Sequence, residues 1–233
     1  MNAAHDQLHP TVAPLAGRLI VSCQAYPGDP MRHPETMTQV AQAVHLGGAA
    51  AVRAQGVRDI TLMKQTLTIP VIGIWKDGTD GVFITPTLEH AKHVARAGAD
   101  IVALDGTRRD RPDGLSFAET VKRLRDHTDA AVMADCDSYE SAMAAAEAGA
   151  DLIGTTLSGY TRARPTTQGP DLELIAQVAA ALPGRAVVAE GRVHTPEQAR
   201  ACLDAGAFAV VVGTAITHPT SITEWFVEAL TAE

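Results

Sequence analysis

The sequence predicts an α/β protein built as a single (β/α)8 TIM barrel. Two observations carry this prediction: a fourfold helix–glycine–strand repeat, and four further strand-like segments between the repeats. In each repeat a helical segment ends at glycine, which readily adopts the left-handed conformation of a helix C-terminus, and an apolar strand follows almost at once. The four glycines are Gly48, Gly98, Gly149 and Gly206. A strand with its helix needs roughly half of the interval between two such glycines, so each interval should hold two units.

Eight apolar segments occur where the repeat requires strands. In chain order they are 18–23, 49–55, 71–76, 101–105, 130–135, 152–156, 185–190 and 208–213. Helices are expected between them, for example from Ser138 to Glu147, and from Pro196 to Leu203 with Thr195 as N-cap. Eight strands alternating with helices in 233 residues suit a small barrel. A doubly wound open sheet is the alternative, although it more usually has roughly five to seven strands.

No change of composition and no Ser/Gly-rich linker divides the chain. Residues 1–233 are therefore expected to form one domain, with residues 1–15 as an N-terminal arm that is either loose or packed. Residues 77–81 have the composition of a turn, and residues 82–84 are expected to form a short extra strand in the loop after Lys76.

Composition and charge exclude several classes of function. The net charge of −8 gives no overall basic field for nucleic acid and no polybasic patch for a membrane. No apolar run approaches the length of a transmembrane helix, and the N-terminus lacks a secretory signal pattern, so a cytoplasmic location is expected. The three cysteines, Cys23, Cys136 and Cys202, have no metal-ligand or disulfide spacing, so we expect no metal site.

Charged residues gather at the predicted strand ends, where barrel enzymes carry their active sites. The apolar run that begins at Ile69 ends in Lys76; Arg53, Asp105, Asp135 and Glu190 follow or end other strands. Burial would lower the pKa of Lys76 and make it a competent base or a Schiff-base nucleophile. Two alternatives remain: a lysine that reaches solvent, and a ring of ion pairs without catalytic purpose.

The seventh and eighth strands end in glycine-bearing segments, Glu190-Gly191-Arg192 and Gly213-Thr214. Loops at these positions are the usual phosphate cradle of the barrel, because glycine lets main-chain amides approach an anion closely. Residues 158–168, with Tyr160 and two arginines, are predicted to form a closing lid. The run 107–112 is either a solvated loop or a cationic flap over an anionic ligand.

Several of these segments together resemble N-acetylmannosamine-6-phosphate 2-epimerase over about residues 18–225. The matching motifs are Val21-Ser22-Cys23-Gln24-Ala25, Val52-Arg53-Ala54-Gln55-Gly56-Val57, Ile72-Gly73-Ile74-Trp75-Lys76, Ile84-Thr85-Pro86-Thr87, Met133-Ala134-Asp135, residues 155–161, Glu190-Gly191-Arg192 and Ala215-Ile216-Thr217. The resemblance implies a phosphate-binding barrel of sialic-acid breakdown that interconverts N-acetylmannosamine 6-phosphate and N-acetylglucosamine 6-phosphate without a cofactor. It also suggests a homodimer.

Site roles follow from the resemblance, residue by residue. Lys76 would be the acid/base at C2, with Glu190 as its carboxylate partner and Asp135 assisting. Gln24 and Arg53 would hold the sugar oxygens and the N-acetyl group, and Arg53 is also the candidate for stabilising the enolate oxygen at C1. Phosphate would be held through the amides of these four residues: Gly191, Arg192, Gly213 and Thr214.

One position departs from the family pattern, which has Ala-Ile-Thr-Arg-Pro where this chain has His218 before Pro219. Histidine cannot make the two parallel hydrogen bonds that arginine makes to a phosphate, and it is only partly charged at neutral pH. Either amides hold the phosphate with help from Arg162, Arg164 or Arg192, or the substrate is less charged. Two other functions stay open: a Schiff-base aldolase or synthase of the same fold, and a sugar-phosphate-binding protein without turnover.

Overall fold

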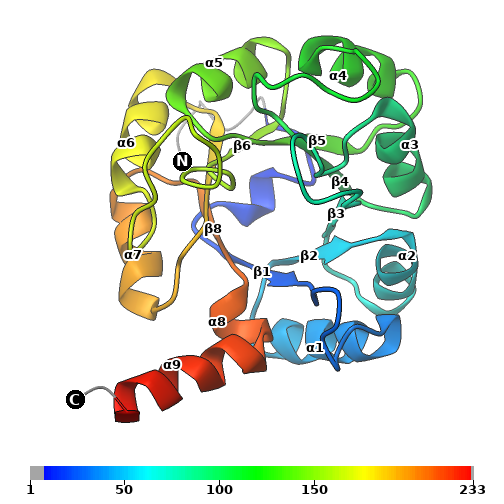
Figure 1. Ribbon diagram of the computed structural model, residues 1–233. Coiled ribbons are helices and arrows are strands. Elements are labelled where there is room, and N and C mark those ends of the chain that lie inside the picture. Colours follow the sequence, from blue (N-terminus) through cyan, green and yellow to red (C-terminus); the bar gives the residue numbers. More distant parts are fainter. Residues whose placement is uncertain (1–7, 232–233) are drawn as a thin grey trace.

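The computed structural model of the protein describes residues 8–231 and has at its centre a closed barrel of eight parallel strands (Figure 1). The strands are β1 (Leu19–Cys23), β2 (Ala51–Gln55), β3 (Val71–Ile74), β4 (Ile101–Asp105), β5 (Ala131–Asp135), β6 (Leu152–Gly154), β7 (Ala186–Glu190) and β8 (Ala209–Val212). Each strand pairs with its neighbour in sequence, and β8 closes the ring on β1. The predicted barrel and its eight strands are confirmed.

Seven helices alternate with the strands and lie outside the ring (Figure 1). They are α1 (Pro34–Leu46), α2 (Val57–Thr66), α3 (Leu88–Arg96), α4 (Phe117–Arg125), α5 (Tyr139–Glu147), α6 (Leu172–Ala181) and α7 (Pro196–Asp204). After β8 come the one-turn α8 (Thr214–Thr217) and then α9 (Pro219–Thr231), which extends away from the barrel.

The two helices that the sequence places from their capping residues are confirmed. The Ser138 hydroxyl accepts a hydrogen bond from the Ser141 amide at the start of α5. The Thr195 hydroxyl accepts one from the Gln198 amide at the start of α7, with proline in the first turn. Each cap satisfies an amide that has no partner within its own helix, which fixes where the helix begins.

The N-terminal segment closes the amino end of the barrel. A short 3-10 helix, η2 (Ala13–Leu15), precedes β1, and the dark blue chain lies across the ring in Figure 1. Val12 and Leu15 are buried in the same apolar cluster as Ile20, Ile72 and Ile101, the first inward side chains of their strands. Residues 8–15 of the predicted arm are therefore a packed plug; residues 1–7 lie outside the described part of the chain.

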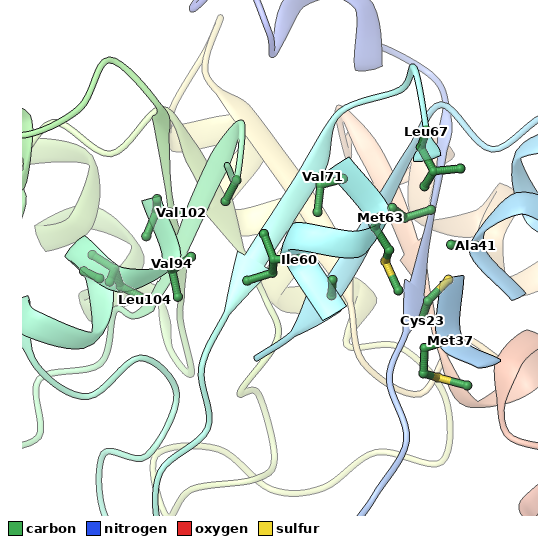
Figure 2. Close-up of a cluster of buried hydrophobic side chains, with 14 of the residues drawn as sticks. Cys23, Met37, Ala41, Ile60, Met63, Leu67, Val71, Val94, Val102 and Leu104 are labelled. Carbon is green, nitrogen blue, oxygen red and sulfur yellow. The ribbon is translucent and has the colours of Figure 1, made fainter. Parts of the chain in front are cut away.

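A second apolar layer fills the space between the strands and helices α1 to α4 (Figure 2). Ile60 and Met63 of α2 are fully buried there against the outer face of the sheet. The layer is tight at Gly73, where an added Cβ would lie 2.6 Å from Val94 Cγ1 and 2.7 Å from Ala99 Cβ. Glycine in β3 thus lets α3 pack directly on the strand.

The loop after β3 departs from the predicted strand over residues 82–84. It makes a single antiparallel bridge, between Ile84 and Lys76, and that prediction is wrong. The Ile84 carbonyl instead accepts from the Asp105 amide of β4 (3.0 Å), and Thr85 turns the chain with a φ of 46°. On its other side the segment is joined to residues 75–77 by two main-chain hydrogen bonds, from the Asp77 amide to the Phe83 carbonyl (3.0 Å) and from the Thr85 amide to the Trp75 carbonyl (2.7 Å).

Helices in residues 8–231 are all too short or too polar to cross a membrane.

We expect Leu15→Ala to lower the free energy of unfolding by about 2 to 5 kcal/mol, because it opens a cavity in the packed plug. Leu46→Ala is the matched control, since Leu46 is 89% exposed on α1 and its loss should change stability by less than about 0.5 kcal/mol. Urea unfolding followed by circular dichroism measures both. Equal effects of the two substitutions would contradict the assignment of residues 8–15 as a plug.

Candidate active site

Strand alternation brings charged side chains together at the carboxyl end of the barrel. Successive side chains of a strand point to opposite faces, so the residue two positions after a buried inward residue also points inward. Met133 and Val188 belong to the interior cluster, and Asp135 and Glu190 lie two positions beyond them. The same rule places Arg53 two positions beyond Ala51 of the interior cluster.

Arg53 occupies the centre of this arrangement and is only 1% exposed. Its Nη1 donates to Asp135 Oδ1 (2.9 Å) and to Glu190 Oε2 (2.7 Å), and its Nη2 donates to Asp135 Oδ2. Burial alone would lower the pKa of Arg53, but the charges of Asp135 and Glu190 outweigh it and raise the pKa above its ordinary value. The guanidinium is therefore a fixed positive charge under the mouth of the barrel.

Thr156 adds a hydroxyl to the two carboxylates. Its Oγ1 lies 2.7 Å from Asp135 Oδ1 and 3.1 Å from Glu190 Oε2. Burial raises the pKa of Glu190 above its ordinary value, while Arg53 acts in the opposite direction. Glu190 can therefore hold a proton more readily than an exposed glutamate does.

Lys76 follows β3 and faces the same centre. The pKa of Lys76 is lowered from 10.5 to about 8, mainly by burial; the nearby charge of Arg53 acts in the same direction, and the charges of Glu190 and Asp135 act against it. The Nζ atom lies 5.5 Å from the centre of the Tyr26 ring, a cation–π contact when the amine is charged.

A cavity of about 350 Å³ opens above this centre, within the size range of small-molecule sites. It is lined by the following predicted site residues: Gln24, Lys76, Tyr160, Glu190, Gly191, Arg192, Gly213, Thr214 and His218. Arg53 and Asp135 do not line it and lie beneath its floor, buried behind Glu190. The two buried residues thus act on the cavity through Glu190 and Lys76.

Gln24 stands on the wall of the cavity beside β1. Its amide nitrogen donates to the Ser22 hydroxyl (2.7 Å), and its Oε1 is buried without a hydrogen-bond donor among the described residues. An unpaired buried acceptor is costly, and a ligand with an N–H or O–H group would satisfy it.

Main-chain amides are free at one end of the cavity. Gly191 has a φ of 114° and Arg192 a φ of 54°, a left-handed pair in which the first position requires glycine. Within residues 8–231, the amides of Gly191, Arg192, Gly213 and Thr214 have no hydrogen-bond acceptor. Free amides in consecutive positions are suited to bind an anion.

Of the three arginines considered for phosphate, Arg162 does not line the cavity, and the other two have partners of their own. The Arg192 guanidinium donates to the Ser158 carbonyl (2.7 Å) and the Thr167 hydroxyl (3.0 Å), and it stacks 5.1 Å from the Tyr160 ring. Arg164 is paired with Asp171 (2.7 Å), outside the cavity. Arg192 therefore fastens the loop 158–168 to β7, and its amide remains available.

His218 lines the cavity but is bonded on both ring nitrogens. Nε2 lies 3.1 Å from Asp29 Oδ2 and Nδ1 lies 2.8 Å from the Ser221 hydroxyl. The Ser221 amide also donates to Nδ1 (3.3 Å), so that nitrogen is an acceptor and His218 caps the start of α9. A phosphate contact would require one of these bonds to be exchanged.

The run that follows β4 is partly folded into the site. Arg109 lines the cavity and pairs with Asp105 (2.6 Å), whereas Arg111 is buried and donates to the carbonyls of Asp105 and Thr85. Arg108 is exposed. The run is thus neither wholly solvated nor a free flap.

Sequence reasoning did not assign site roles to Tyr26, Thr156 and His194, which line the cavity. The alternation rule could have found Thr156, since it is two positions beyond Gly154 of β6. Tyr26 and His194 lie in loops, where no periodicity predicts direction. Within residues 8–231, no three His, Cys, Asp or Glu side chains are grouped as metal ligands.

A family model and curated relatives that match this chain carry the same name, N-acetylmannosamine-6-phosphate epimerase. The family model described as "Putative N-acetylmannosamine-6-phosphate epimerase" matches residues 37–232. A relative named "Putative N-acetylmannosamine-6-phosphate 2-epimerase" from Cutibacterium acnes is 63% identical over 220 residues, covering 94% of this chain and 96% of the relative. One of the same name from Caldanaerobacter subterraneus is 48% identical and covers 91% of each chain.

Two solved structures are similar to this chain in fold. N-acetylmannosamine-6-phosphate 2-epimerase from Clostridium perfringens superposes with a TM-score of 0.90 at 36% identity, covering 98% of this chain and all of that one. Orotidine 5'-phosphate decarboxylase from Pyrococcus horikoshii, at a TM-score of 0.59 and 14% identity over 92% of this chain and all of that one, shares the fold alone.

We expect the Lys76 amine to titrate at about pH 8, because burial and the Arg53 charge disfavour its protonated form. The rate of its acetylation by acetic anhydride as a function of pH, read by mass spectrometry, measures this value. Glu190→Gln should lower the pKa further, since it removes a negative charge that favours the ammonium.

Asp151→Asn is the matched control, because Asp151 pairs with Arg125 outside the cavity and its neutralisation should leave Lys76 unchanged. A Lys76 that titrates near 10.5 in the folded protein would contradict the electrostatic assignment.

Proposed function

Because the chain belongs to the N-acetylmannosamine-6-phosphate epimerase family, we propose that it is an isomerase that inverts C2 of N-acetylmannosamine 6-phosphate to give N-acetylglucosamine 6-phosphate. One observation carries the proposal beyond the family: Lys76 and Glu190 line one cavity whose end offers free main-chain amides. An acid/base pair and an anion site in one cavity are what epimerisation of a sugar phosphate requires.

The reaction needs a proton removed from C2 and returned to the opposite face. In the ring-opened sugar, C2 is adjacent to the C1 carbonyl, so loss of its proton gives an enolate. We assign Lys76 as one acid/base and Glu190 as the other: one accepts the C2 proton as the C–H bond breaks, and the other donates a proton as the new C–H bond forms. No bond to a cofactor is needed, and we propose that none is used.

The electrostatics support this division of roles. A pKa of about 8 leaves a useful fraction of Lys76 neutral at pH 7, and burial keeps Glu190 more readily protonated than an ordinary glutamate. Two groups whose pKa values both lie closer to the working pH can each accept or donate a proton at small cost. Arg53 positions Glu190 through a hydrogen bond, and the charges of Arg53 and Asp135 act on the pKa of Glu190 from beneath the floor.

The rest of the cavity is suited to hold the substrate. We propose that Gln24 binds the N-acetyl or hydroxyl groups through its unpaired Oε1, and that the free amides at Gly191, Arg192, Gly213 and Thr214 bind phosphate. This arrangement explains how the family's arginine can be replaced by His218. The phosphate contact passes to the main chain, and His218 holds α9 and the Asp29 loop.

We place the reaction in amino-sugar breakdown, including that of sialic acid, in the cytoplasm. A phosphate monoester carries about two negative charges at neutral pH and does not cross a bilayer unaided, so the enzyme and its substrate share a compartment.

The proposed function is tested by NMR of N-acetylmannosamine 6-phosphate with the protein in deuterium oxide. We expect N-acetylglucosamine 6-phosphate to form with deuterium at C2. Lys76→Ala should abolish both epimerisation and deuterium exchange at C2. The sugar phosphate should still bind to this variant, as measured by calorimetry. Lys92→Ala, outside the barrel, should behave as wild type.

The other outcomes discriminate among the alternatives. Borohydride trapping of substrate on Lys76 would indicate Schiff-base chemistry. Binding without exchange would indicate a protein without turnover, and full exchange in Lys76→Ala would remove Lys76 from the mechanism.

We also propose that the barrel is the one domain of this chain and that it forms a homodimer through α9. No side chain of α9 is buried, and Phe226, Val227 and Leu230 are 69%, 52% and 85% exposed. Helical spacing places these three on one face. An apolar face of this kind on a helix that leaves the barrel fits a second copy of the chain.

We expect Leu230→Asp to shift the protein from dimer to monomer in sedimentation velocity, because it places a charge in the apolar face. Glu228→Ala, on the opposite side of α9 by helix geometry, should stay dimeric. A wild-type protein that is monomeric at micromolar concentration would contradict the dimer.

A further inference from the structure

One hydroxyl, that of Thr156, stands between the two carboxylates of the site. Its Oγ1 is 2.7 Å from Asp135 Oδ1 and 3.1 Å from Glu190 Oε2. A threonine hydroxyl has one proton to donate, so it can donate to only one of these oxygens at a time. Two acceptors that carry no proton would leave the second contact as a repulsion between lone pairs.

The remaining donors do not remove this conflict. Arg53 Nη1 already reaches the same two oxygens, at 2.9 Å and 2.7 Å, and uses both of its protons to do so. The charged groups that face Glu190 are Arg53 of β2, Asp135 of β5 and Lys76 after β3. The second contact of Thr156 becomes favourable when Glu190 itself carries a proton and donates it to the hydroxyl.

We propose that Thr156 is a two-way hydrogen-bond partner that serves Glu190 in both of its protonation states, and so positions it for proton transfer at C2. When Glu190 is a carboxylate, the Thr156 hydroxyl turns toward it and donates, while Asp135 keeps its two bonds from Arg53. When Glu190 is an acid, it donates to Thr156 Oγ1, and the hydroxyl donates to Asp135. The inference rests on the proposed function, in which Glu190 gains and loses one proton in every turnover.

A rotating hydroxyl is better suited to this task than a fixed donor. A group that can only donate favours the carboxylate, and a group that can only accept favours the acid, whereas a hydroxyl does both by rotation about one bond. The backbone of Thr156 is held on each side: the Thr155 amide donates to the Val188 carbonyl (3.1 Å), and the Leu157 amide donates to the Cys136 carbonyl (3.0 Å). The proton moves while the oxygen stays in place.

The neighbouring threonine supplies a matched control. The Thr155 hydroxyl is also buried near Glu190, but it contacts the main chain there, at the Glu190 carbonyl (3.1 Å) and amide (3.2 Å). Thr155→Val and Thr156→Val therefore each remove one hydroxyl from adjacent positions, and Thr156→Val alone removes a partner of the carboxylates.

The first test compares the pH dependence of kcat for N-acetylmannosamine 6-phosphate in Thr156→Val, Thr156→Ser and Thr155→Val. For Thr156→Val we expect kcat to fall about tenfold to a hundredfold, the range for loss of a hydrogen bond to a charged group, with little change in KM. The pH limb that belongs to Glu190 should move upward, because the bond that the hydroxyl donates to the charged carboxylate is stronger than the bond that it accepts from the neutral acid, so on balance it lowers the pKa of Glu190. Thr156→Ser should restore both, and Thr155→Val should keep the wild-type profile.

The second test does not depend on the reaction. Titration of the Glu190 carboxyl by ¹³C NMR in protein labelled at glutamate side chains, assigned with Glu190→Gln, should show a higher pKa in Thr156→Val than in Thr155→Val or wild type. If the wild type fails to turn over the sugar phosphate, the proposed function fails while this titration still decides the role of Thr156. Should Thr156→Val not fold, as judged by circular dichroism, Thr156→Ala replaces it. Equal pH profiles and equal titrations for the position 155 and 156 variants would overturn the proposal.

Discussion

The burial of one guanidinium governs the chemistry of this site. Arg53 is 1% exposed, and a buried charge without partners is strongly destabilising, so Asp135 and Glu190 must lie against it. Their position fixes the rest: Thr156 is shared between the two carboxylates, and Lys76 meets a positive charge beside it. Burial makes the Lys76 amine partly neutral and the Glu190 carboxyl readily protonated, and the Arg53 charge adds to the first effect and opposes the second.

The barrel makes this cluster possible. Arg53, Asp135 and Glu190 belong to β2, β5 and β7, which are not neighbours in the ring. Closure of the sheet turns their inward side chains toward one axis, and the plug at Val12 and Leu15 fills the opposite end. The apolar layers below hold the charged layer away from water, which strengthens every interaction within it.

The far end of the cavity presents main-chain amides that have no acceptor in the described part of the chain. The left-handed pair at Gly191 and Arg192 exposes amides, and Thr217 of α8 is fixed to β1 by a hydrogen bond from its hydroxyl to the Ser22 carbonyl (2.7 Å). Arg192 and His218 have become structural residues that hold, respectively, the loop 158–168 and α9. In this chain the side chains position the loops, and the loops present the amides.

The sequence by itself determined the barrel, its eight strands, the caps of α5 and α7, and the place of Lys76 and Glu190 at strand ends. These features follow from local rules, namely the period of two in strands, glycine at helix ends and hydroxyl caps. Tertiary structure alone decided that Arg53 and Asp135 lie beneath the floor, that Thr156 bridges two carboxylates, and that residues 82–84 make one bridge instead of a strand. Those outcomes depend on distances between side chains of strands that are far apart in sequence, and the pKa of Lys76 depends on the same distances. No local sequence pattern encodes these distances, because they are set by how the closed barrel pairs its few buried charges.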